Sequence, residues 1–308
     1  MTQIPTPQTD LSPRAWSALL LLGLIWGGSF LSIRMALDHM GPLTAVLHRT
    51  FWAMLVLWAV VVVRGVPLPR GRRIWVGFGV MGLLNNVIPF GLMSWGQLHI
   101  DSGLTSIFNA TTAIFGVVLA AVFFADERLT ARKALGVGLG FAGVALAIGP
   151  AALLQFDLTS LAQLAVVAGT LSYAVAGIWA RTRLGGVAPV VAAAGMLTGS
   201  TAILIPLTLL VEGLPTLALP VQTWAAIAYY ALIATALAYL LYYRVLAMAG
   251  SGNLMLVTLL IPPVAIVLGA VVRDERLSSQ ALGGFALLAL GLIVLDGRLW
   301  KHLTSGRR

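Results

Sequence analysis

Hydrophobic positions along the chain are grouped into long runs, which short segments rich in Pro, Gly or charged residues separate. The runs cover about residues 15–37, 43–63, 74–99, 104–124, 133–149, 161–180, 188–211, 221–248, 253–272 and 280–296. Most approach the roughly 20 apolar residues that a helix needs to cross the hydrocarbon core of a bilayer. The pattern predicts an all-α integral membrane protein with ten transmembrane helices and the lipid bilayer as its partner.

A short polar motif occurs twice and divides these runs into two sets of five. Asp126–Leu129 and Asp274–Leu277 are both Asp-Glu-Arg-Leu, and they follow the fourth and the ninth run. Glycines recur at nearly the same separation, as Gly136 with Gly284 and Gly143 with Gly291. Because each half holds an odd number of spans, the halves must lie in the bilayer in opposite orientations. We therefore expect two inverted five-helix repeats around a central cavity.

The expected domain boundaries follow from the runs. Repeats at 15–149 and 161–297 are joined by an external linker at 150–160. An N-terminal tail at 1–14 and a basic tail at 298–308 flank them. Fifteen Lys and Arg residues fall on the side that holds both termini and three on the opposite side. By the positive-inside rule both termini are cytoplasmic, in the inner membrane of a prokaryote.

Composition narrows the function classes. Hydrophobic residues make up 59% of the 308 positions and charged residues 9%, with a net charge of +9. The basic residues lie in short loops rather than in one stripe, so nucleic acid is not an expected partner. The chain has no Cys, its four His are scattered and no phosphate-binding loop occurs, so we expect no metal, no cofactor and no enzymatic activity. We take a monomer as the expected assembly.

Three features resemble a known family. They are the Leu-Ile-Trp-Gly-Gly-Ser-Phe run at 24–30, the His48-Arg49 pair in the second span, and a Glu-Arg-Leu-(Thr/Ser) step after the fourth and ninth spans. Together they resemble the drug/metabolite transporter superfamily, EamA type, from about Trp16 to Asp296. Within it the chain is most similar to the YddG-type amino-acid exporters. The resemblance implies a ten-helix basket around a central cavity that opens alternately to each side.

Polar and aromatic residues within the spans are the candidates for substrate binding, because a polar solute needs hydrogen-bonding groups at mid-depth. Pro89 frees a backbone carbonyl about one turn earlier, which beside Asn85 and Asn86 would form a cradle for an ammonium group. Helix–helix contact by the amides and an interfacial belt of aromatics remain alternatives. The candidates are Trp26, Asn85, Asn86, Trp95, Asn109, Tyr173, Trp179, Tyr239 and Thr258.

Prolines and charges within or beside the spans are assigned to movement or architecture. Pro89, Pro262 and Pro263 are expected to form hinges or fixed bends. His48, Arg49, Glu127 and Glu275 are interpreted as structural or gating charges. Arg49 could instead hold a carboxylate, but its place about two turns from Pro42 favours snorkelling to the interface or capping a neighbouring helix. Thr130 and Ser278 are placed to cap the helices that follow them.

These features predict a secondary transporter that exports small metabolites, most of all amino acids, by alternating access of a neutral, aromatic-lined cavity. No Asp or Glu lies within a span, which disfavours proton coupling through a buried acid. The alternative of the same fold is an exporter of drugs or quaternary ammonium compounds, since aromatic walls also hold cations. A membrane-embedded enzyme or a channel is less favoured.

Overall fold

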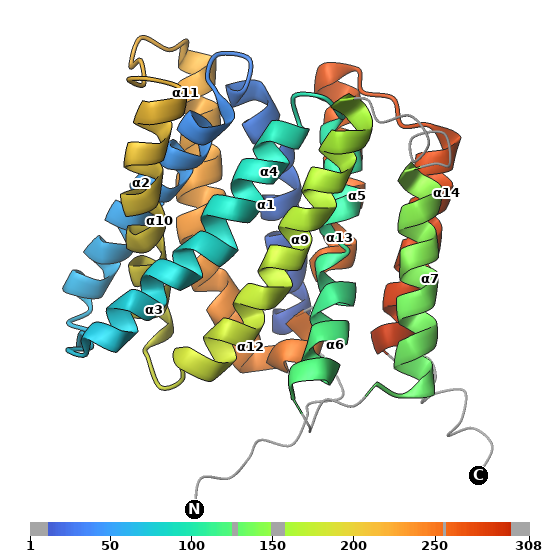
Figure 1. Cartoon of the computed structure of the whole chain (residues 1–308), viewed down its shortest axis with the longest axis horizontal. Coiled ribbons are helices and arrows are strands. Elements are labelled where there is room, and N and C mark those ends of the chain that lie inside the picture. The colour runs from blue at the N-terminus through green and yellow to red at the C-terminus, as the bar shows by residue number, and fades with distance from the viewer. Residues whose placement is uncertain (1–11, 125–128, 149–157, 255–256, 297–308) are drawn as a thin grey trace, which may run out of the picture.

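The structure is a computed structural model, and it describes residues 12–124, 129–148, 158–254 and 257–296. In this part of the chain every regular element is a helix, and the helices form one bundle (Figure 1). Seven helical stretches are long and apolar enough to cross a bilayer, and shorter apolar helices at Leu260–Arg273 and Ser279–Leu295 accompany them. The elements are α1 (Pro13–Ala36), α2 (Pro42–Val63), α3 (Arg72–Gly82), η1 (Leu83–Val87), α4 (Ile88–Gly96), α5 (Ser102–Asn109), α6 (Thr112–Phe123), α7 (Ala131–Ile148), α9 (Leu158–Arg183), α10 (Pro189–Val211), α11 (Val221–Ala228), η2 (Tyr229–Leu237), α12 (Ala238–Leu254), α13 (Val257–Arg273) and α14 (Ser279–Asp296).

The helices make ten crossings, because α3, η1 and α4 form one span, α5 and α6 a second, and α11, η2 and α12 a third. The bundle has two ends. We call the end with Asp38, the start of α2 and the start of α11 the Asp38 face, and the end with Val63 and Arg72 the Arg72 face. The first half begins with a helix that runs towards the Asp38 face. The second half begins with α9, whose Ala162 lies beside Gly96 at the Asp38 face, so α9 runs the other way. The halves are inverted, as predicted.

Packing between the halves also follows a two-fold pattern. The first span, α1, packs against α13 and against the span formed by α11, η2 and α12. Its counterpart in the second half, α9, packs against α5 and α6 and against the span formed by α3, η1 and α4. Each contact therefore recurs with the two halves exchanged. Such an exchange is what an in-plane pseudo-two-fold axis produces.

Two of these composite spans contain a π-helical segment at matching positions. The segment is η1 in the span of α3 and α4, and η2 in the span of α11 and α12. In the first half the segment ends at Val87, two residues before Pro89. A π-helical bond from the carbonyl of Leu84 would need the N–H of residue 89, which proline does not have. The hydroxyl of Ser172 on α9 donates to this carbonyl instead, at 2.7 Å. Ser172 thus occupies the carbonyl of Leu84, and the ammonium cradle beside Asn85 stays a prediction.

Glycines permit the closest helix contacts. α7 and α14 lie side by side at one edge of the bundle (Figure 1). A β-carbon added to Gly143 would lie 2.7 Å from the carbonyl oxygen of Gly284, and one added to Gly136 would lie 2.8 Å from that of Gly291. The glycines that recur in the sequence therefore face each other across this pair. Small residues allow such close backbone approach between membrane helices.

The second Asp-Glu-Arg-Leu motif forms a compact helix-to-helix corner. Asp274 has a φ of 55°, a left-handed conformation that Asp tolerates better than most residues, and the next N–H bonds the carbonyl of Gly269. The side chain of Ser278 then caps α14 by accepting from the N–H of Ala281 at 3.1 Å. Thr130 caps α7 in the same way, so both predicted caps are confirmed. Glu127 lies outside the described residues.

The two prolines of α13 do not break it. The helix is continuous from Val257 to Arg273 and includes both Pro262 and Pro263. Beside this stretch, a β-carbon on Gly27 of α1 would lie 3.0 Å from the carbonyl oxygen of Ile261. Close packing against α1 thus supports α13 where proline removes backbone donors. A hinge at these prolines stays a prediction.

Candidate functional site

A cavity of about 470 Å³ lies between the two halves. Residues from α1, α2 and the three composite spans line it, together with residues from α9, α10 and α13. The chain therefore builds this space from both repeats, at the depth where the π-helical segments interrupt the central spans. A volume of this size suits a small metabolite.

The structure brings six of the nine candidate binding residues to the cavity wall: Trp26, Asn85, Asn109, Tyr173, Tyr239 and Thr258. Three others are not among its lining residues. Asn86 is fully buried and donates to Ser200 on α10 at 2.7 Å, so it joins helices. Trp95 packs on His99, with 5.0 Å between the ring centres, and Trp179 donates to the carbonyl of Gly77.

Sequence reasoning did not assign several wall residues as binding candidates. Thr235 lies four residues before Tyr239, and Tyr242 and Tyr243 lie three and four residues after it. Residues at these spacings share one face of a helix, so the position of Tyr239 could have indicated the other three. Ser29, Phe30, Phe90 and Gln97 also line the cavity.

Arg49 is the largest departure from expectation, because it neither snorkels nor caps a helix. Its side chain lies in the cavity wall and the residue is only 8% exposed. The Nε donates to the Oγ1 of Thr235 at 2.9 Å, and the Cζ lies 3.8 Å above the centre of the Phe90 ring. These two contacts fix the guanidinium on two sides.

The hydroxyl that accepts from Arg49 is itself oriented by η2. Thr235 donates its single hydroxyl proton to the carbonyl of Tyr230, five residues earlier, at 2.8 Å. With that proton used, the hydroxyl oxygen presents lone pairs towards the guanidinium. The π-helical segment therefore has a chemical consequence, since it positions the acceptor that holds Arg49.

Aromatic side chains form the wall nearer the Arg72 face. The indole of Trp26 donates to the carbonyl of Ala234 in η2 at 3.1 Å, and its ring lies 6.0 Å from that of Tyr242. Tyr243 adjoins Tyr242, with 5.3 Å between the ring centres. The wall thus offers flat apolar surfaces that end in polar groups.

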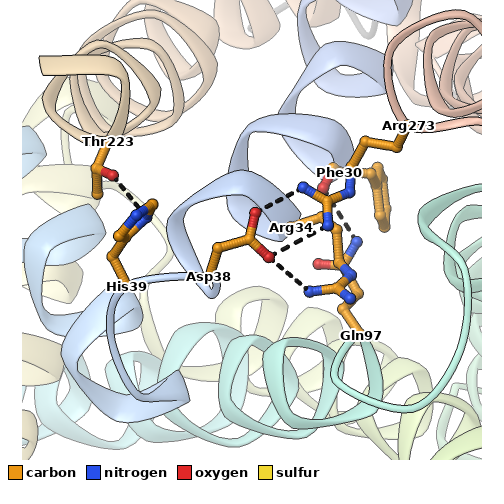
Figure 2. A network of polar contacts seen from close by, with 7 residues as sticks. All are labelled: Phe30, Arg34, Asp38, His39, Gln97, Thr223 and Arg273. Carbon is orange, nitrogen blue, oxygen red and sulfur yellow. Dashed lines mark hydrogen bonds and ion pairs between the residues drawn. The ribbon is translucent and has the colours of Figure 1, made fainter. Parts of the chain in front are cut away.

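Polar contacts join helices at the Asp38 face (Figure 2). Asp38 accepts from Arg273 of α13 at 2.6 and 3.2 Å and from Arg34 at 3.3 Å. One layer deeper, the side chain of Gln97 donates to the carbonyl of Phe30 at 3.0 Å. These contacts tie the end of α1 to α13 and to α4 above the cavity.

The other assigned charges stabilise helix ends or lie apart from the cavity. Glu275 accepts from the hydroxyl of Ser102 at 2.7 Å and from the N–H of Gly103 at 3.3 Å, so it caps α5. Asp101 precedes this cap; burial raises its pKa, and the neighbouring Glu275 adds to the increase while Arg34 opposes it.

His48 does not line the cavity, and its Nδ1 accepts from the indole of Trp52 at 3.1 Å. Within the described ranges no group of three or more His or acidic residues is suited to hold a metal ion.

Comparison with known proteins agrees with this architecture. A model of the EamA-like transporter family matches the chain twice, over residues 14–149 and 160–295. The chain belongs to this family. The EamA resemblance noted in the sequence is thereby confirmed, and so are the ten-helix fold with two repeats and the assignment as a multi-pass membrane transporter rather than an enzyme.

Relatives of this EamA protein extend over nearly its whole length. It is similar to a probable terminal-alkyne amino-acid exporter of Streptantibioticus cattleyicolor, with 29% identity over 305 residues, which are 97% of this chain and 99% of that protein. A probable amino-acid metabolite efflux pump of Escherichia coli (strain K12) is 25% identical, over 93% of this chain and 96% of the other. A crystal structure with 19% identity has a TM-score of 0.66 and covers 92% of this chain and 96% of its own, which shows the shared fold.

Proposed function

We propose that this EamA protein is a secondary transporter that exports small metabolites, foremost amino acids, across the cytoplasmic membrane of a prokaryote. The observation that carries the proposal is the cavity between the inverted halves, whose wall combines amides, hydroxyls and aromatic rings. Such a wall suits zwitterions with varied side chains. The names of two relatives, an amino-acid exporter and an amino-acid metabolite efflux pump, support the same substrate class.

The proposed mechanism is alternating access by a monomer. Each half packs against the other through corresponding helices, and such inverted pairs are the usual architecture of alternating-access carriers. In this structure Asp38, Arg273 and Gln97 tie the helices at the Asp38 face. We place that face outside the cell and both termini in the cytoplasm, because most Lys and Arg residues fall on the opposite side. Opening requires these ties to separate, with Pro89, Pro262 and Pro263 as the bends that accommodate the movement.

Transport into proteoliposomes that hold the purified protein tests this function. We expect saturable counterflow of labelled amino acids, and we expect Trp26→Ala to reduce it because Trp26 forms part of the cavity wall. Trp16→Ala is the matched control, since Trp16 is 42% exposed and does not line the cavity. Flux that never saturates would indicate a channel, and no amino-acid flux beside saturable movement of a lipophilic cation would indicate the drug exporter.

A further inference from the structure

Arg49 is the single charged residue among those that line the cavity in the described part of the chain. A charged side chain within a membrane span is costly and usually pairs with an opposite charge. No Asp or Glu lines this cavity, and no described acidic residue forms an ion pair with Arg49. The guanidinium therefore keeps an uncompensated positive charge, since arginine does not lose its proton in proteins.

The two contacts of Arg49 leave one edge of its guanidinium available. Thr235 uses the Nε, and the ring of Phe90 covers one flat face. The described residues provide no hydrogen-bond acceptor for Nη1 or Nη2. Neither nitrogen is fully buried, in contrast to the buried polar atoms of the interior that lack a partner. Both terminal nitrogens thus remain accessible from the cavity. A guanidinium held in this way presents two parallel N–H groups, the geometry that a carboxylate accepts.

The rest of the wall indicates what accompanies the carboxylate. Tyr242 and Tyr243 follow Thr235 by seven and eight residues along η2 and α12, a rise of roughly 10–12 Å at helical spacing. With Trp26 they form an aromatic surface towards the Arg72 face. The cavity therefore carries one positive group, beside Phe90, and an aromatic surface that extends from Trp26 to Tyr242 and Tyr243 towards the Arg72 face.

We propose that Arg49 binds the carboxylate of the transported molecule, and that the substrates are amphipathic carboxylates whose apolar part lies against Trp26 and Tyr242. This inference rests on the proposed function, because it takes the cavity as the transport site. It selects carboxylates, with or without an amino group, over compounds that carry only a cation. A drug or quaternary ammonium compound would place its positive charge beside Arg49 without an acid to balance it.

Calorimetric titration of the purified protein in nanodiscs tests the proposal with three ligands of one shape. L-Phenylalanine carries a carboxylate and an ammonium group, N-acetylphenylalanine carries only the carboxylate, and phenylalaninamide carries only the ammonium group. Charge-assisted hydrogen bonds predict that the protein binds the first two at least about tenfold more tightly than the third. Equal or tighter binding of phenylalaninamide, or no binding of either carboxylate, overturns the proposal.

Variants locate the selectivity. Arg49→Gln is expected to abolish the preference, Arg49→Lys to keep part of it, and Thr235→Val to weaken it by loosening the guanidinium. Arg64→Gln is the matched control, because Arg64 is an exposed arginine at the other end of α2. A preference that persists in Arg49→Gln overturns the proposal. The ligand series on the unmodified protein needs no variant, so a variant that fails to fold leaves the test intact.

The two proposals can fail separately. Saturable amino-acid flux that phenylalaninamide inhibits as well as phenylalanine would remove the carboxylate site and leave the transport function standing. Selective binding of carboxylates without flux of any amino acid would refute the proposed transport function while supporting the site at Arg49.

Discussion

The N-terminus of α2 has no cap of its own, which makes its stability depend on another helix. Its N-cap residue is Gly41, which has no side chain, and its first helical residue is Pro42. The carboxylate of Glu212 at the end of α10 accepts from the N–H of Leu43 at 2.8 Å, from the N–H of Thr44 at 2.8 Å and from its hydroxyl at 2.7 Å. Glu212 therefore satisfies orphan donors that a capping side chain would normally satisfy.

We expect Glu212→Ala to lower the free energy of unfolding by about 1–3 kcal/mol. Loss of an N-cap costs about 0.5–2 kcal/mol, and loss of a negative charge at a helix N-terminus costs about 0.3–1 kcal/mol. Three bonds to a buried carboxylate would cost more, but Glu212 is half-buried, so water replaces part of the interaction. Glu212→Gln keeps the shape and one acceptor oxygen, and we expect an intermediate loss.

Gly41→Ala tests the same contact from the other side. A β-carbon at Gly41 would overlap the carboxyl group of Glu212, so even this small residue displaces the cap. Because both changes remove the same bonds, the double variant should lose about as much as the larger single loss rather than the sum. Equilibrium unfolding in mixed micelles measures all three losses. Strictly additive losses, or a Gly41→Ala variant as stable as the unmodified protein, would refute this account of the cap.

Three further predictions follow from the helix ends and interfaces. Burial raises the pKa of Asp101, so the native state holds this proton more strongly than the unfolded state does. The contribution of Asp101 to stability therefore falls as pH rises from the ordinary aspartate range through the raised pKa. Asp101→Asn should remove that part of the pH dependence in thermal unfolding scans between about pH 4 and 7. Gly143→Ala should destabilise the protein by about 1–3 kcal/mol through overpacking of α7 against α14, whereas Gly138→Ala, whose β-carbon meets open space, should not, and equal melting temperatures would contradict the interface. Asp38→Asn should lengthen the distance between spin labels on the outer ends of α1 and α13, but only in a minor population, because the bond to Arg273 is partly exposed and such pairs are worth about 0–1 kcal/mol; an unchanged distance distribution would exclude a role in closing that face.

The spans could be predicted from the sequence because a bilayer imposes a length and forbids unpaired backbone groups. The observed helices begin and end near the expected runs, apart from α12, which continues to Leu254 where a boundary near residue 248 was expected. The six additional residues, 249–254, are mostly small or polar in the sequence, and such residues end a hydrophobic run without ending a helix. The role of the residue after the repeated motif could also be predicted from the sequence, because Ser278 caps α14 as its position implies.

The cavity could be predicted only in part. Asn85 and Asn86 are equivalent by type and position, yet one lines the cavity and the other bonds Ser200 on α10. The distance of Arg49 from Pro42 favours snorkelling if this part of α2 faces lipid, but the structure places the side chain in the cavity wall. Polar residues identify a span that carries function, but they do not say which way each side chain points.

The sequence by itself determined ten spans, their grouping into two halves, and the inversion that an odd number of spans requires. Those properties depend only on the length and order of the apolar runs. The tertiary structure alone decided which helix faces meet at the cavity, where the π-helical segment η2 directs Thr235 towards Arg49, and how Glu212 caps α2. In a membrane protein the lipid-facing and the packed surfaces are both apolar, so hydrophobic periodicity does not separate them. The orientation of each helix therefore depends on contacts between residues far apart in the chain.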